Sequence, residues 1–425
     1  RNTTPNICRL ANSGMIFENH FSQSSWTTPN QFSFLTSVNP EIHNVKNAFV
    51  DRLDNRIVTL TESLRKNGYK TVWGGYTLFT VNEENGGLRG FSDAYPDDLT
   101  SDRWQTIIGE FYENYQKEKT PFFIYFYGSD LHFPYRLDSR DVHEWIKTIP
   151  EDYPVTVEEI DKIIGSYLKD NSEKIFSKEI ITEYPEIFLN NEDMNGEKLI
   201  SWFWSLASAT FDGTDEEKTK VLSQFNWRVW KIIYDAYIEN VKTLAAQKYG
   251  DRIVEFTRTA YDVRLNQIDQ NMEDFIDSLL TGEQLRDNTI VVFLSDHGEE
   301  FMEHGGFEHH TLYNELLRIP LIIKVPGISP RRVQEPTQTI DVFPTILDLV
   351  GIKIPKSAQG ISLVSYLTGE KDKNTEDRYI VSSNGDSTAI QNRQWKMIKN
   401  YLPERIGSEL YYLVQDSQEK ENLRT

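Results

Sequence analysis

The chain has 425 residues, with 45 Lys and Arg against 65 Asp and Glu, so its formal net charge is −20 at pH 7. Because such an excess of negative charge repels a phosphate backbone, nucleic acid is excluded as a partner, while 38% hydrophobic and 12% aromatic residues exclude intrinsic disorder. The single cysteine, Cys8, rules out an internal disulfide, and no apolar run reaches the roughly 18–20 residues of a membrane span.

Helical and strand patterns alternate along most of the chain. Apolar residues spaced three and four positions apart, closed by Asn or Gly, predict helices over residues 5–12, 28–35, 55–66, 261–280 and 343–350. Apolar runs predict buried strands over residues 121–127 and 289–294, which end at polar residues, and over 321–325, which ends at Pro-Gly. Strands are also predicted over 15–21 and 70–73, where each follows a helix and its glycine stop. Continuous apolar strands between amphipathic helices predict an α/β fold, with a large, mostly parallel central sheet covered by helices on both faces.

Two regions differ from this alternation. Residues 138–249 are charged, rich in Trp and without a buried-strand run, which predicts a helical insertion. From about residue 378, short alternating segments predict a small antiparallel sheet. The predicted organisation is therefore an α/β catalytic domain over 1–137 and 250–370, the insertion, and a small C-terminal α+β subdomain over 371–425.

Polar clusters follow three of the predicted elements, and ligands of open α/β sheets bind beyond the carboxyl ends of the strands. Asp296 and His297 directly follow the strand over 289–294. A carboxylate and an imidazole at a strand end can ligate a divalent metal. The alternative is a solvated acidic loop, because three glutamates follow closely.

Thr27 and His132 mark the other two clusters. A hydroxyl beside a helix N-terminus lies where anions bind, but it becomes a nucleophile only if a metal or a base removes its proton. Plain helix capping is the commoner reason for a threonine at such a position. His132 follows the strand over 121–127, where an imidazolium can bind an oxyanion or protonate a leaving group. A surface-loop histidine is the alternative there.

Taken in order, these clusters resemble the sulfatase family of the alkaline-phosphatase superfamily. The resemblance is carried by residues 4–17, 25–37, 64–71, 285–305, 312–327, 341–360 and 409–423. It spans nearly the whole chain outside 138–249. It implies a large α/β sandwich with a mostly parallel central sheet and a small C-terminal antiparallel sheet.

The resemblance also implies roles for individual residues. Thr27 falls on the nucleophile position, where it is also a metal ligand together with Asp296 and His297. His132 falls on a position that contacts the transferred group. Tyr76 is expected to bind the substrate, because it follows the segment in which the family has a lysine. Either His309 or His310 is expected to do so as well, and the sequence does not show which of the two it is. The implied cofactor is one divalent cation, which is Ca, Mg or Mn.

The chain departs from formylglycine sulfatases at the nucleophile segment. That group has Cys or Ser at the nucleophile position, followed by a spaced Pro and an Arg, whereas this chain has Thr27, Pro29 and Gln31. Threonine cannot be the formylglycine precursor, so a geminal-diol mechanism is excluded if Thr27 is the nucleophile. Threonine nucleophiles are instead typical of the phosphodiesterase and phosphotransferase branches of the superfamily, which favours phosphoester chemistry.

The acidic pair that ends the family's first strand has no counterpart in this sequence. Two protein ligands, Asp296 and His297, are too few for a dedicated site of a hard divalent cation. We therefore expect the first strand and further metal ligands to lie N-terminal to Arg1 in the natural protein.

These observations predict a sulfatase-like, metal-dependent hydrolase of sulfate esters or phosphate mono- and diesters that acts through a covalent threonyl intermediate. The expected substrates are small-molecule or saccharide esters. A phosphotransferase that uses the same intermediate and a non-catalytic binding protein on a sulfatase scaffold are the alternatives. The sequence is compatible with the cytoplasm and with secretion followed by removal of a signal peptide. It is also compatible with assembly into a homo-oligomer.

Overall fold

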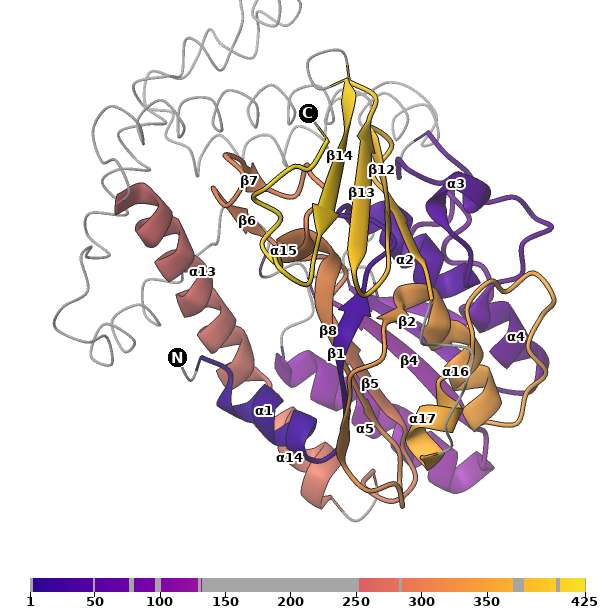
Figure 1. Ribbon diagram of the computed structural model, residues 1–425. Coiled ribbons are helices and arrows are strands. Elements are labelled where there is room, and N and C mark those ends of the chain that lie inside the picture. The colour runs from indigo at the N-terminus through magenta and orange to yellow at the C-terminus, as the bar shows by residue number, and fades with distance from the viewer. Residues whose placement is uncertain are drawn as a thin grey trace, which may run out of the picture. The chain divides into compact units, whose positions relative to one another are not determined.

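The computed structural model describes residues 3–48, 50–75, 80–95, 101–128, 131, 252–282, 285–369, 378–402 and 406–424. The chain divides into two compact units, residues 1–136 with 264–425, and residues 137–263. The first unit contains both the main sheets and the C-terminal sheet (Figure 1). The helical insertion predicted for 138–249 lies outside the described residues.

The larger of two central sheets is built around strand β1. Its order is β10-β1-β8-β5, with β9 also paired to β1. The strands are β1 (Met15–Phe21), β5 (Val291–Leu294), β8 (Arg318–Lys324), β9 (Arg331–Val333) and β10 (Thr337–Gln338). Strands β9 and β10 run parallel to β1, whereas β8 runs antiparallel to both β1 and β5. The sheet is therefore mixed, because the alternation of apolar residues that predicts a strand does not encode its direction.

The second central sheet is entirely parallel. Strand β2 (Lys70–Gly75) lies between β3 (Asp93–Tyr95) and β4 (Phe122–Tyr127). The rings of Trp73 and Tyr125 stack across β2 and β4 with their centroids 4.9 Å apart. Cross-strand aromatic pairs of this kind hold the register of neighbouring strands.

Helices cover both faces of these strands. They are α1 (Pro5–Asn12), α2 (Thr27–Thr36), α3 (Pro40–His43), α4 (Leu60–Lys66), α5 (Ser101–Glu118), α13 (Arg252–Asn271), α14 (Glu273–Thr281), α15 (Asn314–Leu317), the 3-10 helix η2 (Thr339–Asp341), α16 (Val342–Leu349) and α17 (Val364–Thr368). Alternation along β8 shows the two faces. Leu321 and Ile323 belong to the core beneath α2, α4, α16 and α17, whereas Ile322 packs with Leu10 of α1 and Ile276 of α14. The α/β fold with helices on both faces is confirmed.

Two predicted helices have different bounds in the structure. Helix α4 begins at Leu60 instead of residue 55, because Thr59 and Glu62 form a capping box that fixes the start. The helix predicted over 261–280 is two helices, α13 and α14, and Met272 separates them. None of the helices among the described residues combines the length and the apolar character that crossing a membrane requires.

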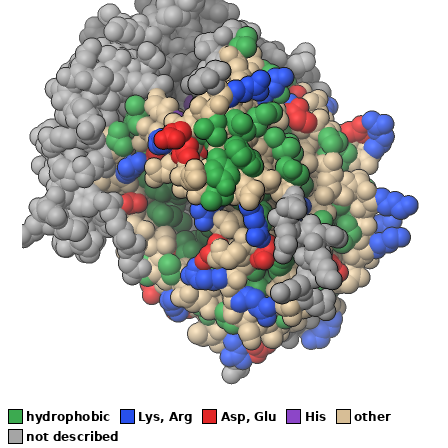
Figure 2. Space-filling view, viewed as in Figure 1, with side chains coloured by type: hydrophobic (Ala, Val, Ile, Leu, Met, Phe, Trp, Pro, Cys, Tyr) green, Lys and Arg blue, Asp and Glu red, His purple; other side chains and the backbone are tan. Residues whose placement is uncertain are grey.

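The C-terminal sheet is antiparallel, as predicted, in the order β11-β12-β13-β14. Its strands are β11 (Ile380–Ser383), β12 (Ser387–Gln391), β13 (Trp395–Asn400) and β14 (Gly407–Tyr412). Along β13, Lys396 and Ile398 are buried, whereas Trp395 and Met397 are exposed. Ile390 of β12, which pairs with Met397, is exposed as well. Figure 2 shows hydrophobic side chains gathered on this side of the molecule.

Candidate functional site

Thr27 is the first residue of α2, and Trp26 is its N-cap in an extended conformation. The helix predicted over residues 28–35 therefore begins one residue earlier than expected. Proline is tolerated throughout the first turn, where backbone N–H groups have no intrahelical acceptor. Pro29 is therefore no barrier to a helix that starts at Thr27, and the hydroxyl of Thr27 lies at the N-terminal end of the helix.

The segment around Thr27 is closed to solvent except at one point. Every described side chain over residues 20–38 is buried apart from Trp26 and Thr27, which are partly exposed. The hydroxyl of Thr27 can therefore meet a ligand from solvent while the rest of α2 is held in the core.

Thr27, His297 and Asp296 are brought together although 269 positions separate Thr27 from Asp296 in the chain. The Thr27 Oγ1 atom lies 3.1 Å from His297 Nε2, and the Asp296 Oδ2 atom lies 3.5 Å from the same nitrogen. His297 Nδ1 lies 2.8 Å from the carbonyl oxygen of Gly298. A carbonyl oxygen only accepts, so Nδ1 carries the proton and Nε2 presents its lone pair to Thr27.

Of the two Asp296 carboxylate oxygens, one accepts a hydrogen bond within the protein and the other does not. Its Oδ1 accepts from the His297 backbone N–H at 3.0 Å, but its buried Oδ2 has no hydrogen-bond partner. A buried charged oxygen is rarely left unpaired without a functional reason. Asp296 Oδ2, His297 Nε2 and Thr27 Oγ1 converge, and a carboxylate, an imidazole and a hydroxyl are a donor set that fits a divalent cation.

The loop that carries Asp296 is fixed from two sides. Asn30 of α2 donates its amide N–H to the carbonyl oxygen of Asp296 at 2.5 Å and accepts from the Gln23 backbone N–H at 3.0 Å. Gly298 N–H donates to the carbonyl oxygen of Leu316 at 2.8 Å, and a Cβ at Gly298 would lie 1.9 Å from the carbonyl oxygen of Glu315. Only glycine permits this approach, so the loop holds His297 against α2.

Tyr127 is a site residue that sequence reasoning missed. It ends β4, and its hydroxyl is hydrogen-bonded to the Thr27 side chain. Burial raises the pKa of Tyr127 well above its ordinary value, the charge of Asp296 adds to this, and the bond with Thr27 acts in the opposite direction. The hydroxyl therefore stays protonated. Its position at the carboxyl end of a predicted strand was the available signal.

The structure separates His309 from His310. His309 is buried, and its ring centroid lies 4.4 Å from that of His297 and 5.1 Å from that of Trp26. His310 is exposed, with its ring centroid 6.4 Å from that of Trp26. Of the two, His309 adjoins the Thr27 site. The predicted residues His132 and Tyr76 lie outside the described residues.

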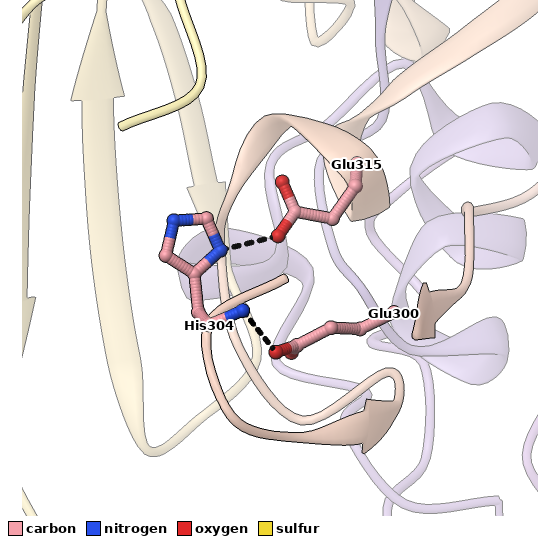
Figure 3. A group of neighbouring side chains, drawn as sticks. All are labelled: Glu300, His304 and Glu315. Carbon is pink, nitrogen blue, oxygen red and sulfur yellow. Dashed lines mark hydrogen bonds and ion pairs between the residues drawn. The ribbon is translucent and has the colours of Figure 1, made fainter. Parts of the chain in front are cut away.

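Among the described residues, a second group of His and Glu side chains also brings possible metal ligands together: Glu300, His304 and Glu315. Figure 3 shows the His304 ring directed at Glu315 and its backbone N–H at Glu300. His304 Nδ1 lies 2.5 Å from Glu315 Oε1, and Nε2 lies 3.0 Å from the carbonyl oxygen of Glu419. Burial opposes protonation, but the bond with Glu315 and its charge raise the pKa of His304 above the ordinary value.

This His304 cluster does not fit a metal, because an imidazolium that donates from both nitrogens has no lone pair left. Glu300 is equally occupied, since it accepts from the backbone N–H groups of His304 and Gly306 and from the Thr311 hydroxyl. The cluster continues into a buried ion pair between Lys396 Nζ and Glu419 Oε1, 2.6 Å apart. We assign it a structural role.

Comparison with known proteins shows the family of the chain. The family model described as sulfatase matches residues 1–352. The chain belongs to the sulfatase family. The model described as N-sulphoglucosamine sulphohydrolase, C-terminal, matches residues 302–425 of this sulfatase-family chain.

Curated relatives carry sulfatase names. Choline-sulfatase of Rhizobium meliloti (strain 1021) is 25% identical over 412 residues, which covers 95% of this chain and 74% of that protein. Arylsulfatase K of Canis lupus familiaris is 27% identical over 237 residues, which covers 53% of this chain and 43% of that protein. This sulfatase-family chain thus spans less than half of the arylsulfatase K relatives that it matches.

Solved structures share the fold. A protein in complex with its substrate D-glucosamine-2-N,6-O-disulfate matches with a TM-score of 0.65 and 20% identity, over 99% of this chain and 88% of that chain. The phosphonate monoester hydrolase of Agrobacterium radiobacter matches with a TM-score of 0.63 and 17% identity, over 99% of this chain and 86% of that chain. Together they confirm the α/β sulfatase fold.

Proposed function

We propose that the chain is a metal-dependent hydrolase of sulfate esters in which Thr27 is the nucleophile. The observation that carries this proposal is the unpartnered Oδ2 of Asp296, which lies beside His297 Nε2 and Thr27 Oγ1. A divalent cation held by these three residues would act as a Lewis acid and lower the pKa of the Thr27 hydroxyl. Which of Ca, Mg or Mn is bound is left to the experiment.

The neighbouring residues would each perform one task. Tyr127, which stays protonated, orients the Thr27 oxygen through its hydrogen bond. The Thr27 oxygen bonds to sulfur while the ester's S–O bond to the alcohol breaks, which leaves a sulfated threonine and the free alcohol. Water then cleaves the threonyl S–O bond and releases sulfate. His309 and Trp26 line the site, and His132 stays our candidate for contacting the transferred group.

The substrate class is a small-molecule or saccharide sulfate ester. Support comes from relatives named choline-sulfatase and delta 4,5-hexuronate-2-O-sulfatase, and from the fold likeness to a structure with a disulfated glucosamine. Phosphate esters are the second candidate, because Thr27 replaces the formylglycine precursor. A phosphonate monoester hydrolase also shares the fold. His310 and Tyr76 remain proposed substrate contacts.

Hydrolysis of aryl sulfate, aryl phosphate and bis-aryl phosphate, each with Mg, Ca and Mn, tests the proposal. Thr27→Ala is expected to lower kcat/KM by at least about 10³-fold, because no other hydroxyl replaces the nucleophile. Thr36→Ala is the matched control at the other end of α2, where the hydroxyl bonds only to the Phe32 carbonyl oxygen in the described structure, and it should retain activity.

Four outcomes are informative. A preference for aryl sulfate supports the sulfatase function, whereas a preference for either phosphate ester moves the assignment to phosphoesters. Accumulation of a transferred group on an added alcohol would indicate a phosphotransferase. Cation binding without turnover of any ester would contradict the enzyme proposal and indicate a binding protein.

A further inference from the structure

The side chain of Asn384 does more than close the turn between β11 and β12. Its Oδ1 atom accepts from the backbone N–H groups of Asp386 at 3.2 Å and Ser387 at 2.9 Å, which is how asparagine stabilises a tight turn. Its Nδ2 atom donates to the carbonyl oxygen of His310 at 3.0 Å and lies 3.5 Å from Ser25 Oγ. The turn needs only the oxygen of this amide, so the nitrogen performs a separate task.

The two acceptors of that nitrogen adjoin the aromatic rings that line the candidate site. Ser25 directly precedes Trp26, and His310 directly follows His309. The Trp26 ring centroid lies 5.1 Å from that of His309 and 6.4 Å from that of His310. The amide nitrogen therefore links the two backbone segments that carry these rings.

Strand β11, which leads into this turn, is held against the segment before Thr27. Its Ser383 donates a backbone N–H to the carbonyl oxygen of Gln23 at 2.8 Å. The backbone N–H of Gln23 donates in its turn to Asn30, the residue that also bonds to the carbonyl oxygen of Asp296. The C-terminal sheet thus reaches the candidate site through its first strand as well as through its first turn.

We propose that Asn384 is a positioning residue of the Thr27 site: it holds in place the backbone segment that carries His309. The inference rests on the proposed function and deepens it, since it names what fixes a ring proposed to line the site. That ring packs against His297, with the centroids 4.4 Å apart. Because a displacement of about 1 Å in an active site can lower the rate about a hundredfold, catalysis depends on a backbone that is fixed at this point.

Matched serine variants test this role. Asn392 closes the next turn, between β12 and β13, and its Oδ1 atom likewise accepts from two backbone N–H groups, those of Gln394 at 2.9 Å and Trp395 at 2.8 Å. Because successive turns of an antiparallel sheet lie at opposite ends of its strands, Asn392 is at the end of β12 away from Asn384. Both side chains are half-buried.

Asn384→Ser and Asn392→Ser each remove the amide without adding a charge, and the new hydroxyl can still accept within the turn. We expect both variants to lower the thermal unfolding midpoint by a similar, small amount. Only Asn384→Ser should lower kcat/KM for the preferred ester, by about tenfold to a hundredfold and chiefly through kcat.

An aspartate pair separates positioning from closure of the turn. Asn384→Asp keeps the oxygen that closes the turn, and it replaces the donor with an oxygen that repels the His310 carbonyl. It should therefore lower kcat/KM at least as much as Asn384→Ser does, although the turn is kept. Asn392→Asp adds the same charge at the other end of β12 and should retain activity.

The ring signals of the histidines report on position without any turnover. The chain has eight histidines, few enough to be followed in proton–carbon NMR spectra of protein with labelled histidine rings. His309→Gln and His310→Gln identify the two signals of interest. Both Asn384 variants should shift these signals, whereas both Asn392 variants should leave them in place.

The results separate this inference from the proposed function. Active wild-type protein whose Asn384 variants match their Asn392 counterparts in kcat/KM overturns the inference alone, and so do unshifted His309 and His310 signals in the Asn384 variants. Wild-type protein that turns over no ester overturns the proposed function, and this inference falls with it whatever the spectra show.

Discussion

The Thr27 site and the His304 cluster are built from the same residue types, yet they are opposite in hydrogen bonding. Both combine histidine with carboxylates, and Asp296, His297, His304 and Glu315 all fall within twenty residues of the sequence. In the His304 cluster, both ring nitrogens and both Glu300 oxygens are occupied by protein partners. In the Thr27 site, a buried carboxylate oxygen has no hydrogen-bond partner. The two regions therefore differ in whether a carboxylate oxygen is left for a cation, which residue type alone does not show.

This contrast also predicts how the two regions respond to mutation. Satisfied buried networks stabilise the fold, whereas unsatisfied groups oppose folding and persist where function requires them. Substitutions in the Thr27 site should therefore remove activity while stability is kept. Substitutions in the His304 cluster should lower stability while activity is kept.

The largest effect is expected from Asp296→Asn. Loss of the carboxylate charge should lower kcat/KM for the preferred ester by about 10⁴-fold, because metal-ion catalysis supplies several kcal/mol of stabilisation in the transition state. The thermal unfolding midpoint without cation should stay level or rise. Asp348→Asn, at an exposed carboxylate that accepts from Ser362, is the control and should retain activity. A variant as active as this control would remove Asp296 from the site.

Lys396→Met should have the largest effect on stability. It leaves Glu419 as a buried, unpaired carboxylate, so we expect the free energy of unfolding to fall by about 3–5 kcal/mol in denaturant titrations. The folded variant should keep the wild-type kcat/KM. Lys399→Met, on the same strand with an exposed side chain, should change the free energy of unfolding little. Equal stability of the two variants would contradict the structural role of the cluster.

The smallest effect is a pH dependence that His304 confers. Because its folded pKa is raised, its protonated form stabilises the fold fully below the unfolded pKa of about 6.5, and this contribution is lost as pH rises through the folded pKa. His304→Gln should therefore be less stable than wild type by about 1–2 kcal/mol at pH 6, with a smaller difference at pH 9.

Its partner provides the internal check on that prediction. Glu315 raises the pKa of His304, whereas Lys420 lowers it, so Glu315→Gln should shrink the difference between pH 6 and pH 9. A stability difference that stays the same at both pH values would show that His304 is not charged in the fold.

Much of the fold follows from local sequence. Helix α1 ends at Asn12 and strand β1 spans Met15–Phe21, as predicted, because proline at the helix start and the Ser13-Gly14 stop between the two elements are local signals. The start of α4 was missed although Thr59 and Glu62 have the spacing of a capping box. The direction of β8 is set by its pairing with β1 and β5, which no local pattern contains.

The site was predicted in part for a related reason. Asp296, His297 and Thr27 were named as candidates because strand ends and helix starts place polar residues at one edge of a sheet, and the folded chain brings them together while their roles stay predictions. Sequence patterns cannot show which buried polar atoms lack partners, so the unpartnered Oδ2 of Asp296 was beyond their reach. Distinguishing His309 from His310 likewise depends on packing against Trp26 and His297, which only the folded chain shows.

The pairing of β1 has a consequence for synthesis on the ribosome. In the described part of the chain, the hydrogen-bonded neighbours of β1 are β8, β9 and β10, which end at Gln338. At about 5–20 residues per second, more than 300 residues take roughly 15–60 s to translate. For that time β1, with its apolar Met15 and Phe17, lacks the strands that it pairs with in the described structure, so the N-terminal segment that carries Thr27 is prone to aggregation until the distant half of its sheet emerges.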